Sequence, residues 1–410
     1  MKKFAKLSVR AMFDSAQSTA LTRFILLYAA MYAAFGVASP FLPAFVSARG
    51  LAPEQLGIVL GAGTAVRLLT APLAGRIGDL TQALRVVLVV CTALAAAVTL
   101  GYLTAHGFWI LLGMSLLHAA SLAPITILAD ALALGSASPP PGSGHRGFEY
   151  GWARGTGSAA FIAGTLLSGQ AVSAFGLDLI VGLQASLLGA AALAAILVPE
   201  LIHHRTADAV RSPAGGVLIL IRLPLFRNLV LVAALILGSH AMHDAFAVIR
   251  WSAAGISSVT ASLLWSESVA AEVLVFFVVG PALVTRLTPA GALAIAALAG
   301  MLRWAVAAQT TDVIALALVQ PLHGVTFALL HLACMRLIAR IVPQGLEGTA
   351  QAIYGTVGIG AAVALLTVVS GALYARLGAQ GFWVMAALCA LALPLTWKLR
   401  QAVIGESRAQ

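Results

Sequence analysis

Long apolar stretches alternate with short polar ones along almost the whole chain. Each apolar stretch holds about 20 residues, which is the length of helix that crosses the hydrocarbon core of a bilayer. The pattern predicts an all-α membrane protein with twelve transmembrane helices. The expected spans are residues 22–46, 55–75, 84–104, 107–134, 148–172, 177–199, 225–248, 259–282, 288–308, 313–336, 350–374 and 378–398.

The longest polar interval inside the chain runs from Glu200 to Arg222 and leaves six spans on either side. Two six-helix halves are a layout of secondary transporters, whose substrate sites lie near the bilayer midplane at the interface of the repeats. A second break, from Ser136 to Gly147, is rich in Pro and Gly and predicts a loop between spans four and five. The expected parts are a cytoplasmic N-terminal tail (1–20), an N-terminal six-helix half (21–199), a cytoplasmic linker (200–224), a C-terminal six-helix half (225–398) and a cytoplasmic tail (399–410).

Composition and charge agree with a membrane location. Of the residues, 61% are hydrophobic and only 9% are charged, whereas soluble domains carry about 25% charged residues. The net charge of +10 does not indicate nucleic-acid binding, because most of the 24 Lys and Arg residues fall in loops on the side of the two termini. Arg49, Arg250 and Arg376 fall on the other side. The positive-inside rule therefore predicts a multi-pass protein of the bacterial inner (plasma) membrane with both termini in the cytoplasm.

The sequence offers little for enzyme chemistry. It contains no HExxH, Walker-type GxxxxGK, GxSxG or paired CxxC motif. Cys91, Cys334 and Cys389 lie within apolar runs, which predicts small core residues rather than a disulfide framework or a metal site. The N-terminal MKKFAKLSVR has neither the apolar core nor the cleavage site of a signal peptide. We therefore expect a protein that is not an enzyme, that binds no metal and needs no cofactor, and that is driven by a proton gradient.

Ionisable residues gather in the stretch from Gly238 to Glu272, although such a group costs roughly 2.5 to 3.5 kcal/mol inside a bilayer. His240, His243 and Asp244 are spaced by three and four residues, which predicts one face of span seven near its outer end. Glu267 and Arg303 lie roughly 12 and 8 Å below the outer ends of spans eight and nine. These two residues are candidates for a structural ion pair.

Glu272 and His323 are the leading candidates for a proton site. Helical rise places them roughly 20 and 15 Å from the outer ends of spans eight and ten, near the midplane. Histidine titrates near neutral pH, and burial brings a carboxyl group toward the same range. Asp244, Glu267 and His240 are further candidates for proton coupling. For His323 and for His331, two turns later, the alternative is a buried histidine that is simply hydrogen-bonded.

The first half holds charges of its own. Asp130 and Arg154 agree in depth within roughly 3 Å, which indicates either a structural ion pair or a role in gating or substrate binding. Glu149 competes as the partner of Arg154. Arg67 has no acid in its own span, so that it either reaches one on a neighbouring span or presents its guanidinium to a bound anion.

Aromatic residues within the spans favour an apolar cavity for a ring-bearing substrate, or simple packing. The candidates for substrate contact are Tyr28, Tyr32 and Trp265, and the wider set adds Phe35, Trp304, Phe327 and Tyr354.

Several stretches resemble known transporters. The loop PLAGRIGDLTQALRVV, with Gly75, Asp79 and Arg85, resembles a degenerate form of the major facilitator signature between spans two and three. YGWARGTGSAAF resembles the Tyr-Gly-x-x-Arg-x-x-Gly-Ser segment of the phenylpropionate permease group, relatives of the lactose permease-like proton symporters. SHAMHDAF, LLWSESVAAEV, MLRW and QPLHGVTFALLHLACMR resemble further segments of that group, so that the likeness covers nearly the whole chain.

The resemblance implies a major facilitator fold, a monomer, and proton-coupled uptake of a small organic solute such as an aromatic acid. Two departures bear on the substrate more than on the mechanism. Gly155 and Thr156 follow Arg154 where that family has a Trp, and Asp244 stands where aromatic or small residues are usual. The positions to which the resemblance carries a functional role are Arg154, His240, Glu272, Arg303, Gln320, His323 and His331.

The leading hypothesis is a secondary active transporter that takes up a small organic solute with protons by alternating access. Protonation of Glu272, coupled to His323, would favour substrate binding, and Arg67 or Arg154 would engage an anionic group. A proton-antiporting exporter of metabolites or drugs would use the same titratable groups, and a membrane receptor or scaffold would need none of them. The expected partners are the solute, protons and the lipid bilayer, and not nucleic acid.

Overall fold

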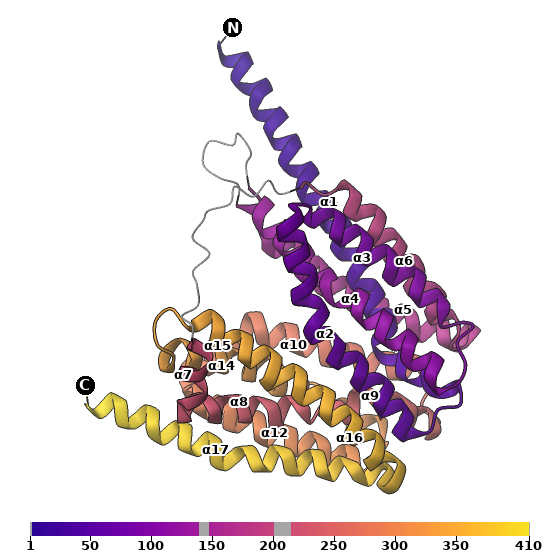
Figure 1. Cartoon of the computed structure of the whole chain (residues 1–410), viewed down its shortest axis with the longest axis vertical. Coiled ribbons are helices and arrows are strands. Elements are labelled where there is room, and N and C mark those ends of the chain that lie inside the picture. The colour runs from indigo at the N-terminus through magenta and orange to yellow at the C-terminus, as the bar shows by residue number, and fades with distance from the viewer. Residues whose placement is uncertain (1, 139–146, 201–214, 410) are drawn as a thin grey trace. The chain divides into compact units, whose positions relative to one another are not determined.

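The computed structural model describes residues 2–138, 147–200 and 215–409, with side chains described for those between 20 and 401. Every regular element in these ranges is a helix (Figure 1). This confirms the prediction of an all-α protein. The predicted loop at 136–147 and the predicted linker at 200–224 lie largely outside the described residues. Helix α7 (Gly216–Arg222) is the helical part of the linker that is described.

Eleven helical segments in the described ranges are long and apolar enough to cross a membrane. The last of these, Glu347–Gln401, has 55 residues, more than twice the length that one crossing needs. It reverses at Gly378, which has a φ of 55° and begins the short 3-10 helix η4 (Gly378–Gly381). Glycine reaches this conformation without steric cost. The segment is therefore two spans, and the twelve predicted spans are accounted for.

The first six spans are single helices. They are α1 (Lys2–Ala48, apolar from Ala20), α2 (Pro53–Thr81), α3 (Leu84–Gly101), α4 (Phe108–Ala137), α5 (Tyr150–Phe175) and α6 (Leu179–Leu197). Among the later spans, α12 (Pro289–Gln309) and α17 (Phe382–Ala409) are also single helices. The other four are assembled from shorter pieces, which are α8 (Pro224–Gly238) and α9 (Ala241–Ala253); α10 (Ser258–Leu274), η1 (Val275–Val279) and α11 (Gly280–Leu287); α13 (Val313–Val319), η2 (Gly324–Leu329) and α14 (Leu330–Ile341); and α15 (Glu347–Ile353), η3 (Tyr354–Ala361) and α16 (Ala362–Leu377).

The breaks in these later spans have local causes. Segments η1, η2 and η3 are π-helical, and such wide turns are frequent at functional sites. Pro321 precedes η2 and lacks the N–H that would continue the helix. Between α8 and α9, the Ser239 hydroxyl donates to the Ile236 carbonyl at 2.6 Å. These interruptions rotate the side chains that follow them away from the positions of an ideal helix.

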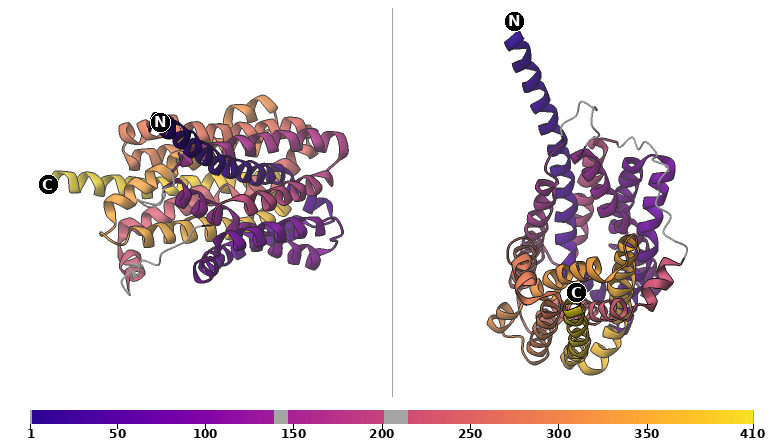
Figure 2. Two further views of the ribbon diagram at one scale, coloured as in Figure 1. Left: turned by 90° about the horizontal axis from the view of Figure 1, so that it is seen from above. Right: turned by 90° about the vertical axis from the view of Figure 1, so that its left-hand side faces the viewer.

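The chain divides into two compact units, each with its own apolar core. Unit 1 comprises Met1–Leu42 and Leu69–Arg205, and unit 2 comprises Pro43–Leu68 and Thr206–Gln410. The core of unit 1 is built around Phe24, Leu88 and Leu128, and that of unit 2 around Phe226, Leu293 and Leu337. Helices α3 and α6 pack together in unit 1, and α12 and α17 do so in unit 2 (Figures 1 and 2).

Residues 43–68, which the sequence assigns to the N-terminal half, group with unit 2. In this segment α2 meets α16 backbone to backbone. A Cβ added to Gly57 would lie 2.8 Å from Cα of Gly371, and one added to Gly371 would lie 2.6 Å from the carbonyl oxygen of Pro53. Small residues permit such approach between membrane helices.

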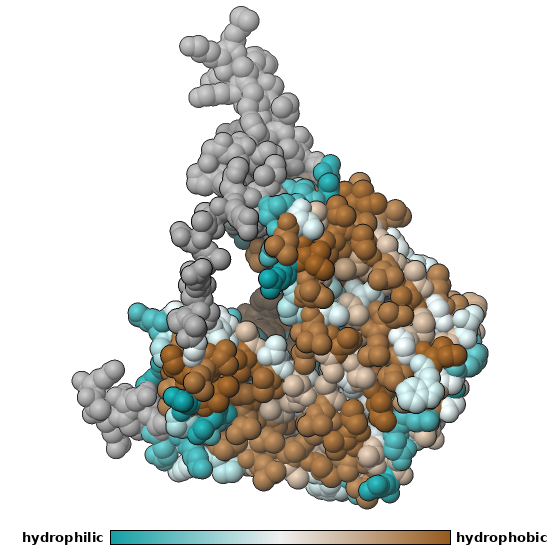
Figure 3. Space-filling view, viewed as in Figure 1, coloured by the Kyte–Doolittle hydropathy of each residue, from teal (hydrophilic) through white to brown (hydrophobic). Residues whose placement is uncertain are grey.

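Large apolar side chains are exposed on both units, as expected of surfaces that face lipid (Figure 3). Examples are Leu69 at 73% and Phe175 at 77% in unit 1, and Leu318 at 74% in unit 2. In a soluble protein such surfaces would favour aggregation, but a bilayer accommodates them.

Gly164→Val should destabilise unit 1. A Cβ at Gly164 would lie 2.3 Å from the carbonyl oxygen of Ala33, so that α1 and α5 would have to separate. Separation would also strain the 3.0 Å hydrogen bond from the Thr165 hydroxyl to the Gly36 carbonyl. Overpacking of this kind costs about 1 to 3 kcal/mol. We expect a lower melting temperature in detergent, and Gly189→Val in α6, where nothing lies within 4 Å, is the matched control.

Candidate functional site

In unit 2, Arg303 of α12 lies at the centre of a group of polar side chains from three other spans. The Arg303 side chain is only 2% exposed. Its Nη2 donates to Oε1 of Gln320 at 2.9 Å, and its Nη1 lies 3.1 Å from Nδ1 of His323. Both partners belong to the interrupted span, on either side of Pro321, where the chain passes from α13 into η2.

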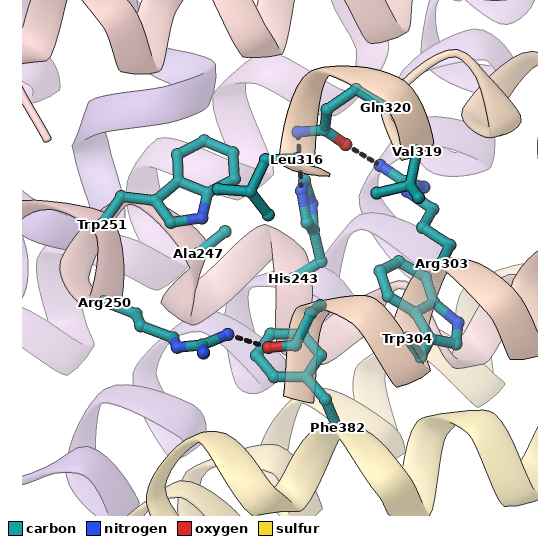
Figure 4. A pocket seen from close by; sticks show the side chains of 11 residues that line it. His243, Ala247, Arg250, Trp251, Arg303, Trp304, Leu316, Val319, Gln320 and Phe382 are labelled. Carbon is teal, nitrogen blue, oxygen red and sulfur yellow. Dashed lines mark hydrogen bonds between the residues drawn. The ribbon is translucent and has the colours of Figure 1, made fainter. Parts of the chain in front are cut away.

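One arm of contacts continues from Gln320 toward α9. Nε2 of Gln320 lies 3.4 Å from Nε2 of His243 (Figure 4). Nδ1 of His243 lies 3.4 Å from Oδ1 of Asp244. His243 is buried, whereas the Asp244 side chain is 55% exposed. Asp244 lies about 14 Å before the end of α9, because the helix runs to Ala253. The group is therefore deeper than the sequence predicts.

The other arm continues from His323 to α10. Nε2 of His323 lies 3.3 Å from Oε2 of Glu272, and the two side chains are 16% and 27% exposed. The structure thus brings together the two residues that helical depth selected as a proton site. We call the six residues Asp244, His243, Gln320, Arg303, His323 and Glu272 the Arg303 network.

Aromatic side chains frame this network. The Trp265 ring stacks on His243 at a centroid distance of 5.1 Å. Trp304 donates from Nε1 to the Ser239 hydroxyl at 2.7 Å, which ties α12 to the break between α8 and α9. The His240 ring lies 5.1 Å from that of His323, and its buried Nε2 has no hydrogen-bond partner among the described residues.

A small cavity lies beside the network, on the side of Trp251, Phe382 and Leu316 (Figure 4). Its volume of about 10 Å³ is close to the space that one water molecule requires. Arg250 closes one side by donating to the carbonyls of Ala307 and, at 3.2 Å, Thr310 at the end of α12.

Unit 1 holds a second polar group, centred on Asp130 of α4. Oδ1 of Asp130 accepts hydrogen bonds from the hydroxyls of Tyr28 and of Tyr150, the latter at 2.8 Å. The predicted ion pair between Asp130 and Arg154 is absent from the described residues, and Oδ1 of Asp130 accepts from the two hydroxyls instead. Equal depth along two helices did not bring these side chains together.

Arg154 of α5 instead faces an aromatic ring. Its guanidinium carbon lies 4.9 Å from the centroid of Tyr32, and its buried Nη1 has no hydrogen-bond partner among the described residues. Gly157 makes room for this ring, since a Cβ there would lie 2.8 Å from it. Tyr28 and Tyr32 stack at 5.8 Å. Arg154 therefore has a donor free for a bound acceptor beside an aromatic surface.

The other predicted residues lie outside these two groups. Glu267 is half-buried and forms no ion pair in the described part of the chain, so the predicted pair with Arg303 is also absent. Arg303 is occupied by Gln320 and His323 instead. Arg67 is exposed on α2. His331 contacts the Tyr354 hydroxyl through Nδ1 at 3.1 Å, the hydrogen-bonded alternative considered above.

Two partners in these groups do not stand out in the sequence. Tyr150 is one of them, although its position one turn before Arg154 places its hydroxyl at the depth of Asp130. Gln320 came only from the family resemblance, because an uncharged amide does not stand out in an apolar helix. Its neighbour Pro321 marks the interruption and is the signal that could have found it.

Comparisons with known proteins agree with this architecture. The family model described as MFS_1 like family matches residues 21–385. A probable 3-phenylpropionic acid transporter of Escherichia coli (strain K12) is 35% identical over 375 residues, covering 89% of this chain and 94% of that protein.

Two solved structures share the fold. The nucleoside transporter NupG has a TM-score of 0.75 at 16% identity and covers 93% of this chain and 98% of its own. A bacterial homologue of the human lysosomal transporter Spinster has a TM-score of 0.70 at 14% identity, with 94% and 97% covered. These relatives are transporters rather than enzymes, as the sequence predicts. The chain belongs to the MFS_1 like family and is a multi-pass membrane transporter of the major facilitator superfamily, in the phenylpropionate permease-like group.

Proposed function

We propose that the protein takes up a small aromatic carboxylate together with protons by alternating access. The observation that carries the substrate class concerns Arg154: its buried Nη1 has no hydrogen-bond partner in the part of the chain that the structure describes, and its guanidinium lies against the Tyr32 ring. A carboxylate matches the free donor, and a phenyl ring matches the aromatic surface. The relative named as a 3-phenylpropionic acid transporter supports the same class.

Proton coupling is supported by the contact between Glu272 and His323. The carboxylate lies inside a span and is only partly buried, at 27% exposed. An intramembrane acid next to a histidine is the usual makeup of a proton relay in transporters. In this proposal, protonation of Glu272 favours substrate binding and its release of the proton accompanies delivery.

The test is uptake of labelled 3-phenylpropionate into proteoliposomes with an imposed pH gradient. An importer of the proposed kind accumulates the solute when protons flow in the same direction and only equilibrates it when the gradient is absent. Accumulation against the proton flow would instead identify the antiporting exporter. No flux and no binding across a panel of aromatic carboxylates would contradict the proposal.

We propose the inner membrane as the location, with both termini in the cytoplasm, because the positive-inside rule favours that orientation. Cytoplasmic reporters fused at either end should be active, whereas one inserted at Gly255, in the loop after α9, should be inactive. The reverse pattern would contradict this orientation.

A further inference from the structure

Arg303, at the centre of the Arg303 network, determines which of the surrounding atoms donate hydrogen bonds and which accept them. An arginine side chain carries five N–H donors and no acceptor. Each atom that it contacts must therefore accept. These atoms are Oε1 of Gln320 at 2.9 Å and Nδ1 of His323 at 3.1 Å.

This sets the tautomer of His323. With Nδ1 accepting from Arg303, a neutral ring carries its hydrogen on Nε2. Nε2 lies 3.3 Å from Oε2 of Glu272, so its hydrogen is donated to that oxygen. A second proton on this ring would create an Nδ1–H that points at the guanidinium, with two donors and two positive charges facing each other. Protonation of the ring therefore requires loss of the contact with Arg303.

The tautomer of His243 follows through Gln320. Because Oε1 of Gln320 accepts from Arg303, its Nε2 is the donor toward Nε2 of His243 at 3.4 Å. His243 then carries its hydrogen on Nδ1, which donates to Oδ1 of Asp244 at 3.4 Å. The two rings are thus opposite tautomers, and each directs its single N–H to a carboxylate.

We propose that Arg303 is a positioning residue that keeps His243 and His323 neutral, so that the transported proton is taken up by a carboxylate at the end of an arm. Glu272 and Asp244 are those carboxylates. The inference rests on the proposed proton coupling and specifies which groups carry it. Glu272 can take the proton without disturbing the network, since a protonated carboxyl group still has an oxygen that accepts the His323 N–H.

The charges around the network agree with this assignment. With both carboxylates ionised, the six residues carry a net charge of −1, and one proton brings them to zero. Among the residues that the structure describes, His323 is also near two other histidines: the His240 ring, from the break before α9, lies 5.1 Å from its ring, and any charge on His243 of the other arm acts on it. Arg250 lies across the cavity from Arg303. The Cys389 thiol lies 3.3 Å from the Ser239 hydroxyl and also contacts Trp304, beside Arg303.

The tautomers are measurable by nitrogen NMR on protein labelled at the histidine rings, in membranes, between about pH 5.5 and 7.5, where free histidine titrates. Single substitutions His243→Gln and His323→Gln assign the two signals. We expect two neutral rings across this range, with the hydrogen on Nδ1 in His243 and on Nε2 in His323. A cationic ring in this range, or the same tautomer in both rings, would overturn the proposal.

Substitution of Arg303 separates positioning from general structural support. In Arg303→Gln the tautomer preference of His323 should be lost and the ring should take a proton at the acid end of the range. Arg303→Lys keeps a charge but lacks the planar guanidinium that binds two acceptors at once, so at least one ring should lose its preference for a single tautomer. Arg336→Gln, which removes an exposed arginine bonded to Thr285 and Pro281, should change neither ring. Unchanged tautomers in both Arg303 variants would contradict the proposal.

Transport by His323→Gln supplies a second readout. Glutamine accepts and donates but does not titrate, so gradient-driven uptake should persist with reduced rate. Loss of coupling in this variant, with substrate exchange retained, would place the proton on the ring and overturn the inference. The NMR result does not depend on the substrate, so a failure of 3-phenylpropionate uptake would leave the tautomer assignment standing and would count against the proposed function alone.

Discussion

Glu272→Gln should abolish accumulation of the substrate against its gradient while exchange of bound for free substrate continues. Glutamine has nearly the same shape and still accepts the His323 N–H at the position of Oε2. It cannot take up a proton, so binding and release of substrate are no longer linked to the gradient. One pH unit is worth about 1.4 kcal/mol per proton, or roughly tenfold accumulation, and the variant should fall to a ratio of about one.

The measurement compares uptake with and without an imposed gradient in proteoliposomes, beside counterflow of labelled substrate. Counterflow reports that the variant is folded and binds, and a normal melting temperature supports this. Glu54→Gln, an exposed carboxylate in the first turn of α2, is the matched control and should accumulate substrate normally. Persistent accumulation in Glu272→Gln would exclude this residue from coupling and leave Asp244 as the acid of the network.

Much of the fold and part of the site follow from two regularities of the sequence. Apolar length gives the spans, because a bilayer imposes one thickness on every crossing. Helical rise gives depth, and this was enough to pair Glu272 with His323, which the structure places 3.3 Å apart. Depth is reliable here because both helices cross the same layer from the same side.

Rotation about the helix axis is what the sequence does not reveal. Asp130 and Arg154 agree in depth, yet Asp130 faces Tyr28 and Tyr150 while Arg154 faces Tyr32. Arg303 likewise binds Gln320 and His323 instead of Glu267. In unit 2 the break before α9 and the turn at Gln320 and Pro321 shift the angular positions of His243 and His323, which follow them. Such irregularities depend on tertiary packing that periodicity cannot predict.

Arg154→Gln should weaken binding of 3-phenylpropionate more than any other single change in unit 1. A hydrogen bond to a charged group contributes about 1.5 to 3 kcal/mol, so we expect a dissociation constant roughly tenfold to a hundredfold higher. Arg154→Lys should recover little, because an ammonium neither stacks on the Tyr32 ring nor offers a bidentate fork.

Isothermal titration of purified protein with 3-phenylpropionate and with its neutral amide separates the two parts of the contact. The amide lacks the carboxylate, so its weaker binding should be nearly the same in wild type and in Arg154→Gln, because the aromatic surface of Tyr32 remains. Arg23→Gln, an exposed arginine of α1, is the control for a general loss of positive charge. If Arg154→Gln bound the acid and the amide as the wild type does, the free donor of Arg154 would have another purpose, and the carboxylate of the substrate would have to be held by a different cation.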